Sequence, residues 1–253
     1  MRVSIVIFLG LMVGTGGALL FSPQTVMAQQ DVLGLNTGTD APYTTEDRKG
    51  FLDLMVAEVF QRIGQKAQVN RYVGASARAL QMSNSGKDDG EALRIKGLKK
   101  KFPNLVMIPE SIIANDFVAY SIKPIEKITN WSSLKPYSIS YLIGWQIFAN
   151  NTKGAERVTT VRGVDQLFSL LKLERVDLSL YERWQGLYQA RLAGVEVITH
   201  EPPLARMDMY MYLHKKHAAL APKAAKALAQ MKKDGSYQRI VDMTLTPLLK
   251  KSS

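Results

Sequence analysis

The residues best suited to binding chemistry follow a short apolar run, Val32 to Leu35, which has the length of a strand. The turn-rich connection after this run contains Asp40, which offers a charge, and Tyr43, which offers a flat aromatic face. Residues 51–63 then form an amphipathic run that predicts a helix. Ligands of open α/β sheets bind at the carboxyl ends of strands, so this connection is a candidate ligand site. An ordinary surface loop is the alternative interpretation.

A catalytic site would need a nucleophile with its base, a metal, or a pair of carboxylates. The chain has no cysteine, which excludes a thiol nucleophile, a zinc–thiolate site and a disulfide framework. His214 and His217 are spaced like metal ligands on one helical turn, but the two lysines between them would repel a cation. The sequence therefore predicts no catalytic residue, no metal and no cofactor.

Asp88, Asp89 and Glu91 form a short acidic turn before a segment, 91–101, whose composition predicts a basic helix. These acids could shift one another's pKa, or they could cap the start of that helix. Capping is the favoured interpretation, because negative charge near a helix N-terminus is stabilising.

The amino terminus has the features of a secretory signal. Arg2 is a short basic region, residues 5–21 are uncharged and largely apolar, and Val26-Met27-Ala28 fits a small-x-small cleavage pattern. We therefore predict a cleaved signal peptide over residues 1–28 and export to the periplasm, with an uncleaved membrane anchor as the alternative. No later segment approaches the ~18 uncharged apolar residues that a spanning helix needs.

The composition describes an ordinary folded chain with a basic excess. Of 253 residues, 46% are hydrophobic and 22% are charged, which suits one large domain or two small ones. The formal net charge is +11, but the lysines are scattered and are not interleaved with exposed-looking aromatic residues. This pattern favours a solvated basic face or an acidic partner over nucleic acid.

Short apolar strands alternate with helices of about three turns along the rest of the chain, which indicates an α/β fold with mostly parallel sheets. A methionine stripe over 207–213 favours a core or hinge strand over a cofactor site. The expected strands are 67–73, 105–108, 117–122, 137–143, 176–181, 195–198 and 207–213. The further expected helices are 75–82, 164–173, 182–192, 218–233 and 235–243.

Several of these segments carry a family resemblance. The segment GTDAPYTT…GFLDLMVAEVFQRIG resembles the amino-terminal segment of the periplasmic solute-binding proteins of polar-amino-acid ABC transporters, the bacterial extracellular solute-binding family 3. Other segments resemble later landmarks of that family in the same order: GKDDGEALRIKGLKKKFPNLVMIPESI, YSISYLIG, VDLSLYE and DGSYQRIVDMTL. Together they span nearly all of the predicted mature chain.

The resemblance implies the type II periplasmic-binding fold. This is an α/β fold of two lobes, with mixed sheets flanked by helices and with two hinge strands between the lobes. Residues 29–118 and 210–253 would form a discontinuous lobe 1, and residues 119–209 would form lobe 2. The ligand would lie between the lobes, which close on it by a hinge motion.

The resemblance also implies roles for single residues. Arg94 would clamp a ligand carboxylate with its planar fork, Tyr43 would stack on the ligand, and Asp40 would lie in the same ligand-facing loop. Glu182 falls where the family has an aspartate that holds the ligand ammonium, and Trp145 replaces a threonine, where it would stack on a ligand or fill the cleft. Two neutral donors for a carboxylate, a serine or threonine before Arg94 and the threonine replaced by Trp145, are absent.

The implied function is capture of a small polar solute, an amino acid or a related carboxylate or amine. The protein would act as a monomer and pass the solute to an ABC permease or a sensor, without a cofactor and without nucleic acid. Two alternatives stay open because fold does not fix function. One is an enzyme on the same fold, of the dehydratase or lytic type, that uses Glu182 or Asp40 as acid or base. The other is an interaction module whose cleft no longer binds a small molecule.

Overall fold

The computed structural model describes residues 32–72 and 75–250, and the predicted signal peptide lies outside them. The helices α1 to α7 cover Phe51–Gln61, Ser76–Asn84, Gln146–Asn151, Val164–Lys172, Arg183–Leu192, Ala221–Asp234 and Ser236–Thr244. The strands β1 to β5 cover Leu33–Thr37, Ala67–Arg71, Gly90–Ile95, Leu105–Ser121 and Ser138–Leu142. The strands β6 to β9 cover Arg157–Val161, Leu178–Glu182, Ile198–Thr199 and Ala205–His214. Short 3-10 helices cover Leu98–Lys100, Trp131–Leu134, Lys215–Leu220 and Thr246–Leu249.

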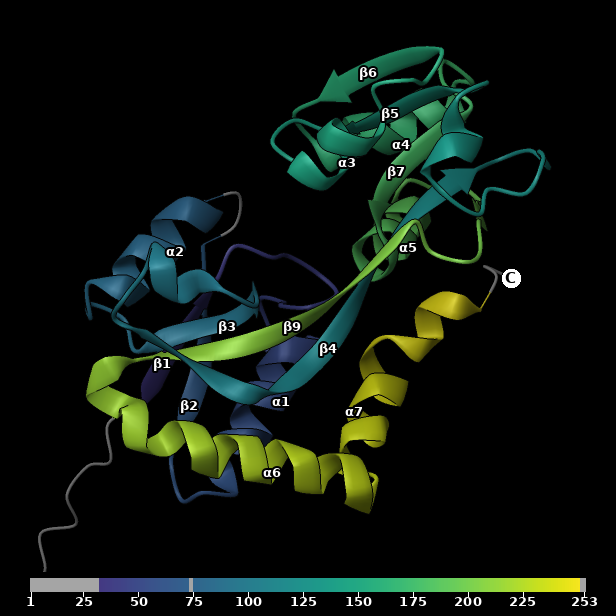
Figure 1. The fold of residues 1–253 in the computed structure, drawn as a ribbon. Helices are drawn as coiled ribbons and strands as arrows, with labels where there is room; N and C mark the ends of the chain where they lie inside the picture. The colour runs from purple at the N-terminus through teal and green to yellow at the C-terminus, as the bar shows by residue number, and fades with distance from the viewer. Residues whose placement is uncertain (1–31, 73–74, 251–253) are drawn as a thin grey trace, which may run out of the picture. The chain divides into compact units, whose positions relative to one another are not determined.

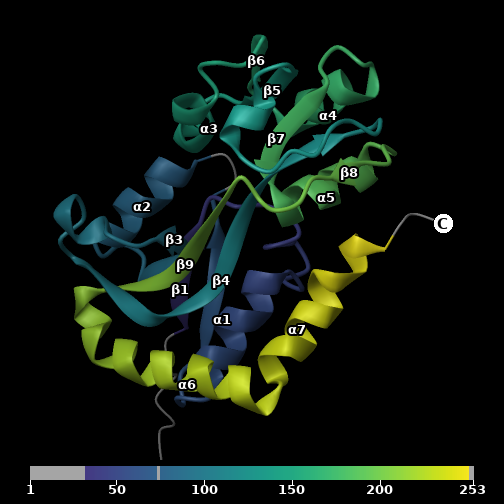
Figure 2. The same cartoon turned by 45° about the vertical axis from the view of Figure 1, so that its right-hand side comes forward.

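The strands form one mixed sheet in the order β2-β1-β3-β9-β4-β7-β5-β6, and β8 pairs with β4. The pairs β1–β2, β1–β3, β5–β6 and β5–β7 are parallel, whereas β9 and β4 pair antiparallel with each other and with their outer neighbours β3 and β7. The long strands β4 and β9 therefore connect two groups of parallel strands (Figures 1 and 2). The predicted mixed sheet with two hinge strands is confirmed, and the expectation of a mostly parallel sheet is wrong.

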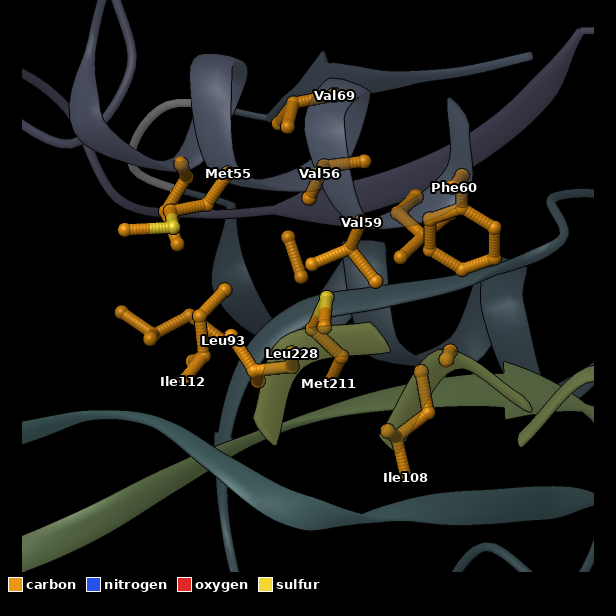
Figure 3. Packing of buried hydrophobic residues seen from close by; sticks show 14 of the residues in the cluster. Met55, Val56, Val59, Phe60, Val69, Leu93, Ile108, Ile112, Met211 and Leu228 are labelled. Carbon is orange, nitrogen blue, oxygen red and sulfur yellow. The ribbon is translucent and has the colours of Figure 1, made fainter. Parts of the chain in front are cut away.

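The first group of strands packs against α1 and α6 through a large apolar core. Helix α1 contributes Met55, Val56, Val59 and Phe60, and α6 contributes Leu228, with fully buried side chains throughout (Figure 3). The helix α1 begins at Phe51 because Asp53, at its third position, accepts the backbone N–H of Gly50 and so satisfies a donor at the helix start.

Strand β9 shows how the alternation of side chains builds this core on one face of the sheet. Met211 and Leu213 are fully buried in it, whereas Tyr212 between them points to the other face and packs with Leu80 of α2 and Leu105. The methionine stripe is thus largely core, but Met207 at its start is 38% exposed.

The second group of strands is covered on both faces. From β4, Phe117 and Ala119 join a cluster with Phe148 of α3, whereas Val118 and Tyr120 join a cluster with α4 and α5. The buried residues of the core around α1 and α6 all come before residue 114 or after residue 208. The buried residues of the clusters around α3 and around α4 and α5 all come from between these positions. The lobe boundaries 29–118, 119–209 and 210–253 stay a proposal.

The sequence expectations for strand β4 and for strand β8, which pairs with it, are wrong. The strands expected over 105–108 and 117–122 are one 17-residue strand, β4. Its pairing with β9 shifts register between Met107 and Ser111 and again before Ile113, and such bulges interrupt the period-two pattern on which the prediction rested. In addition, α3 and β6 were not predicted, and the strand expected over 195–198 is reduced to the two residues of β8.

The helix expected over 91–101 is also wrong, because this segment is strand β3 followed by a 3-10 turn at Leu98–Lys100. Glu, Ala, Leu and Arg favour helices, but β3 lies inside the sheet between β1 and β9, and this tertiary pairing overrides the weak local preference. Gly97, with a φ of 95°, then turns the chain out of the sheet. Within the described residues, no helix is long and apolar enough to cross a membrane.

Candidate functional site

The carboxyl ends of the two parallel strand groups are joined by one side-chain contact. Tyr43 lies in the connection after β1, and Glu182 is the last residue of β7. The Tyr43 hydroxyl lies 3.0 Å from Oε1 of Glu182 and 3.0 Å from Oδ1 of Asn115 in β4. Ligands of α/β sheets bind at the carboxyl ends of strands. In this protein, residues of both strand groups and of the connecting strand β4 meet in that region.

Tyr43 itself is enclosed. Its side chain is fully buried, and its ring meets Phe51 edge to face with centroids 6.0 Å apart. A phenol has one proton, so its hydroxyl can donate to only one of its two acceptors at a time. In this conformation Tyr43 presents no open face on which a ligand could stack, and its role as a stacking residue stays a prediction.

Glu182 is fully buried and caps helix α5. Its Oε2 accepts the backbone N–H of Gln185 at 3.0 Å, while its Oε1 faces Tyr43. Burial raises the pKa of Glu182 to about 7, against the opposing effect of its hydrogen bonds. At neutral pH the carboxyl group therefore exchanges between its protonated and ionised forms. Its predicted contact with a ligand ammonium is untested.

Asp40 and Arg71 form an ion pair at the carboxyl ends of β1 and β2. Oδ1 of Asp40 accepts Nη2 of Arg71 at 2.7 Å and the backbone N–H of Ala41 at 2.9 Å. The Asp40 side chain is 46% exposed and that of Arg71 is 25% exposed. A carboxylate can accept about four hydrogen bonds, so Asp40 keeps capacity for a ligand donor.

Trp145 packs against Tyr181 at the ends of β5 and β7. Their ring centroids are 4.7 Å apart, and Trp145 also stacks on Phe148 at 5.7 Å with nearly parallel planes. Burial, the charge of Glu182 and then the charge of Asp40 raise the pKa of the Tyr181 hydroxyl. Trp145 is half-buried, so it both fills space beside Phe148 and keeps part of its ring accessible.

The guanidinium group of Arg94 is already paired with protein atoms, whereas a ligand clamp needs free N–H donors on this group. Its Nε donates to Oε2 of Glu91 at 2.6 Å, and its two terminal nitrogens donate to Oγ and the backbone O of Ser76 at 2.7 Å each. Glu91 is fully buried. The arginine therefore pairs with a buried acid and fixes the start of α2, and among the described residues no hydrogen bond or ion pair joins it to Tyr43. Its assignment as a ligand clamp stays a prediction.

The acidic turn does not cap a helix, contrary to expectation. Oδ2 of Asp89 accepts the backbone N–H of Gly34, and its Oδ1 accepts Nζ of Lys216 and pairs with Nε2 of His217 at 2.7 Å. Asp89 thus fastens the chain after β9 to β1. Within the described residues no group of three His, Cys, Asp or Glu side chains could hold a metal ion.

Arg71, Asn115 and Tyr181 were not among the predicted site residues. A signal existed for Arg71, because it lies near the end of the expected strand 67–73 and could have been considered under the same strand-end rule that singled out Asp40. Tyr181 likewise ends an expected strand. Asn115 lies in the part of β4 that the sequence left unassigned, so nothing in the sequence pointed to it.

Comparison with known proteins gives one sequence relative and many fold relatives. No family model matches the chain. An uncharacterized protein of Shewanella oneidensis is 30% identical over 173 residues, which are 64% of this chain and 64% of that protein. The chain thus aligns with less than two thirds of its relative's length.

Solved structures share the fold over most of the chain at low sequence identity. A probable amino-acid ABC transporter extracellular-binding protein from Bacillus subtilis has a TM-score of 0.70 and 16% identity, covering 85% of this chain and 97% of that one. A histidine kinase sensor domain similar to periplasmic binding proteins has a TM-score of 0.66 and 15% identity, covering 86% and 96%. An ancestral arginine-binding protein bound to glutamine has a TM-score of 0.63 and 20% identity, covering 84% and 97%.

These likenesses, together with the mixed sheet and its two connecting strands, define the class of structure. The chain has the type II periplasmic-binding fold, as the sequence resemblance implied. At this level of identity the likeness establishes the fold, and the ligand has to be argued from the residues of this chain.

Proposed function

We propose that the protein is an exported solute-binding protein that holds a small polar solute bearing an ammonium group, an amine or an amino acid, at the carboxyl ends of its strands. The half-exposed carboxylate of Asp40 carries the proposal. Asp40 follows the carboxyl end of β1, and the Trp145–Tyr181 pair lies at the carboxyl ends of β5 and β7, so a solute held between the two strand groups would place a cation on Asp40 and an apolar or flat part on Trp145.

Arg71 has a positioning role in this site. Its guanidinium holds Oδ1 of Asp40 at 2.7 Å, which fixes the carboxylate and leaves the second oxygen for the solute. Tyr43 and Glu182 form a buried hydrogen bond between the two strand groups. Because Glu182 is fully enclosed, we favour a carrier over an enzyme that uses it as acid or base.

The proposed setting follows from the predicted signal peptide and from the fold. The protein would be cleaved after residue 28, act as a monomer in the periplasm, and deliver its solute to an ABC permease or a sensor. The fold relatives support both destinations, since one is a probable ABC-transporter binding protein and another is a histidine kinase sensor domain.

The test is a thermal-shift screen of the mature chain with amino acids, small amines and small carboxylates, followed by calorimetry on the best hit. A ligand at 100 times its dissociation constant should add about 2.7 kcal/mol to the free energy of unfolding. Asp40→Asn should weaken the hit by at least about tenfold, because it removes a charged partner.

Asp47→Asn is the matched control, because Asp47 is an exposed acid of the same connection that pairs only locally with Lys49 and Thr45. It should leave the affinity unchanged. A screen without a stabilising compound, or an equal loss of affinity in both variants, would contradict the proposed site.

A further inference from the structure

A cavity of about 520 Å³ lies between helix α5, strand β8 and the last 3-10 helix, Thr246–Leu249. Helix α5 and strand β8 lie side by side here (Figure 2). None of the residues of the proposed solute site lines this cavity. Its volume falls within the range of small-molecule pockets, so the cavity is large enough for a ligand of its own.

The wall of this cavity is largely aliphatic. Its members include Leu187, Val195, Val197, Ile198, Leu248 and Leu249. Ile198 is 40% exposed and Leu249 is 57% exposed, so a molecule in the cavity reaches these side chains directly. Covering aliphatic surface that faces water is favourable, and the wall therefore suits a ligand with an apolar body.

The last 3-10 helix, which forms one side of the cavity, is held in place at both of its ends. Nη2 of Arg191 in α5 donates to the backbone O of Pro247 at 3.1 Å and to that of Lys250 at 2.7 Å. Leu245, which precedes the 3-10 helix, is fully buried in the core around α1 and α6. Both sides of the cavity are therefore fixed relative to each other.

Two of the charged lining residues are already paired. Arg183 forms ion pairs with Glu201, which also lines the cavity, and with Asp116 of β4. Asp116 in turn pairs with Arg206 of β9. These charges balance one another, so they give a ligand little net attraction.

The remaining charges favour an anion. Arg191 and Lys250 are exposed cations of the lining, Glu196 is its remaining acid, and no ion pair involves these three within residues 32–72 and 75–250. Lys172 adds a cation at the end of α5, where its Nζ donates to a backbone carbonyl. Asp242 adds an acid at the start of the last 3-10 helix, where it accepts a hydroxyl group. Cations thus outnumber acids here, and an anionic head group is attracted.

We propose that this cavity binds a small aliphatic carboxylate, with its chain on the aliphatic wall and its carboxylate beside Arg191 and Lys250. A guanidinium carries five N–H donors, and the two on Nη2 of Arg191 are engaged by backbone carbonyls. Its other N–H groups have no partner in the described part of the chain and are available for the carboxylate. The site is separate from Asp40 and does not depend on the proposed function.

The test is a two-dimensional NMR titration of the mature chain with butyrate, hexanoate and octanoate, and with hexan-1-ol and hexylamine as uncharged and cationic counterparts of hexanoate. Saturable shifts of the backbone amides of Leu187, Ile198 and Leu249 should appear with the carboxylates. Affinity should rise about fourfold for each added CH₂ group. Hexan-1-ol should bind more weakly than hexanoate, and hexylamine more weakly still.

Lys250→Glu is the variant that tests the charge, because it reverses an exposed cation and leaves the aliphatic wall intact. It should weaken hexanoate by about fivefold or more and leave hexan-1-ol unchanged. Lys226→Glu, an exposed lysine of α6 outside the lining, is the matched control and should change neither affinity.

Leu249→Asp is the variant that tests the wall, and it should weaken hexanoate and hexan-1-ol alike, by about tenfold or more. Met243→Asp, at a residue of α7 that is 64% exposed and outside the lining, is its control and should leave both affinities unchanged. Asp40→Asn should bind hexanoate as the unaltered chain does, which separates this cavity from the proposed solute site.

The absence of a saturable shift with any carboxylate would overturn the proposal, and so would an affinity that does not depend on chain length. Equal binding of hexanoate, hexan-1-ol and hexylamine would also overturn it. The same holds for unchanged hexanoate binding in both Lys250→Glu and Leu249→Asp.

Discussion

The hydroxyl of Tyr43 lies 3.0 Å from Oε1 of Glu182, although the two residues are 139 positions apart in the sequence. The same hydroxyl lies 3.0 Å from Oδ1 of Asn115. One phenolic proton therefore faces two acceptors, and a protonated Glu182 would relieve this shortage by donating its own proton. The position of this proton couples the connection after β1 to the end of β7.

Tyr43→Phe should destabilise the fold more at pH 8 than at pH 5. At pH 8 Glu182 is largely ionised and loses a hydrogen-bond donor in a buried place, which costs about 1–3 kcal/mol. At pH 5 Glu182 is protonated and needs that donor less. Urea unfolding of the mature chain at both pH values measures the difference. Tyr188→Phe, at a half-buried position of α5, should change neither value, and an equal loss at both pH values for Tyr43→Phe would contradict the coupling.

Glu182→Gln should flatten the dependence of stability on pH. Because burial raises the pKa of Glu182 from 4.5 to about 7, the folded chain keeps a proton between these values that the unfolded chain has released. Unfolding then releases a proton, so the free energy of unfolding falls as pH rises through this window, by up to about 3 kcal/mol. Below pH 4.5 the contribution is fully present.

Glu91 contributes to the same slope, since burial raises its pKa to about 7 despite the attraction of Arg94. Glu182→Gln should therefore remove only part of the decline between pH 5 and 8. Urea midpoints at closely spaced pH values give the slope for the unaltered chain and the variant. An identical slope in both would show that Glu182 is ionised throughout the window.

The first part of the fold could be predicted because its signals are local. Gly50 and Phe51 open a helix with a regular apolar face, and the expected helix over 51–63 differs from α1 only by its last two residues. The segment after Gly90 failed because its signal is not local. The residues of β3 prefer helices, and only the pairing with β1 and β9 makes them a strand.

The pairing of Arg94 with protein groups has a physical reason of the same kind. In a regular strand Glu91 and Arg94 would point to opposite faces. The pairing of β3 with β9 shifts register between these two residues, and this bulge brings their side chains to 2.6 Å. A sequence does not show where a bulge falls, so Arg94 looked available for a ligand. Asp40 was singled out by the strand-end rule and Trp145 by the family resemblance, and both lie in the connections that follow strands, β1 and β5.

Arg94→Ala should therefore act on stability and leave solute affinity unchanged. The variant leaves the fully buried Glu91 without its cation, and because the pKa of Glu91 is already about 7, its carboxyl group then takes up a proton; the lost charge-assisted hydrogen bond should cost about 1–3 kcal/mol. The double variant Glu91→Gln with Arg94→Met removes both charges and should recover part of the loss. Urea unfolding measures stability, and calorimetry with the best hit of the solute screen measures affinity. A loss of affinity with unchanged stability would restore Arg94 as the ligand clamp.

Asp89→Asn should loosen the attachment of the chain after β9 to β1. Burial alone would raise the pKa of Asp89, but hydrogen bonds from Lys216, the Gly34 backbone and His217 lower it below its ordinary value of 3.8. An acid whose pKa is lower in the folded state stabilises the fold above pH 3.8, and this contribution is lost as pH falls through the folded value. We expect a loss of about 1–3 kcal/mol at pH 7 that shrinks as the pH approaches 3. Urea unfolding at pH 7 and pH 3.5 measures it, with Asp208→Asn, an exposed carboxylate of β9, as the control. A loss that stays constant down to pH 3.5 would mean that the shape of Asp89, and not its charge, holds the two segments together.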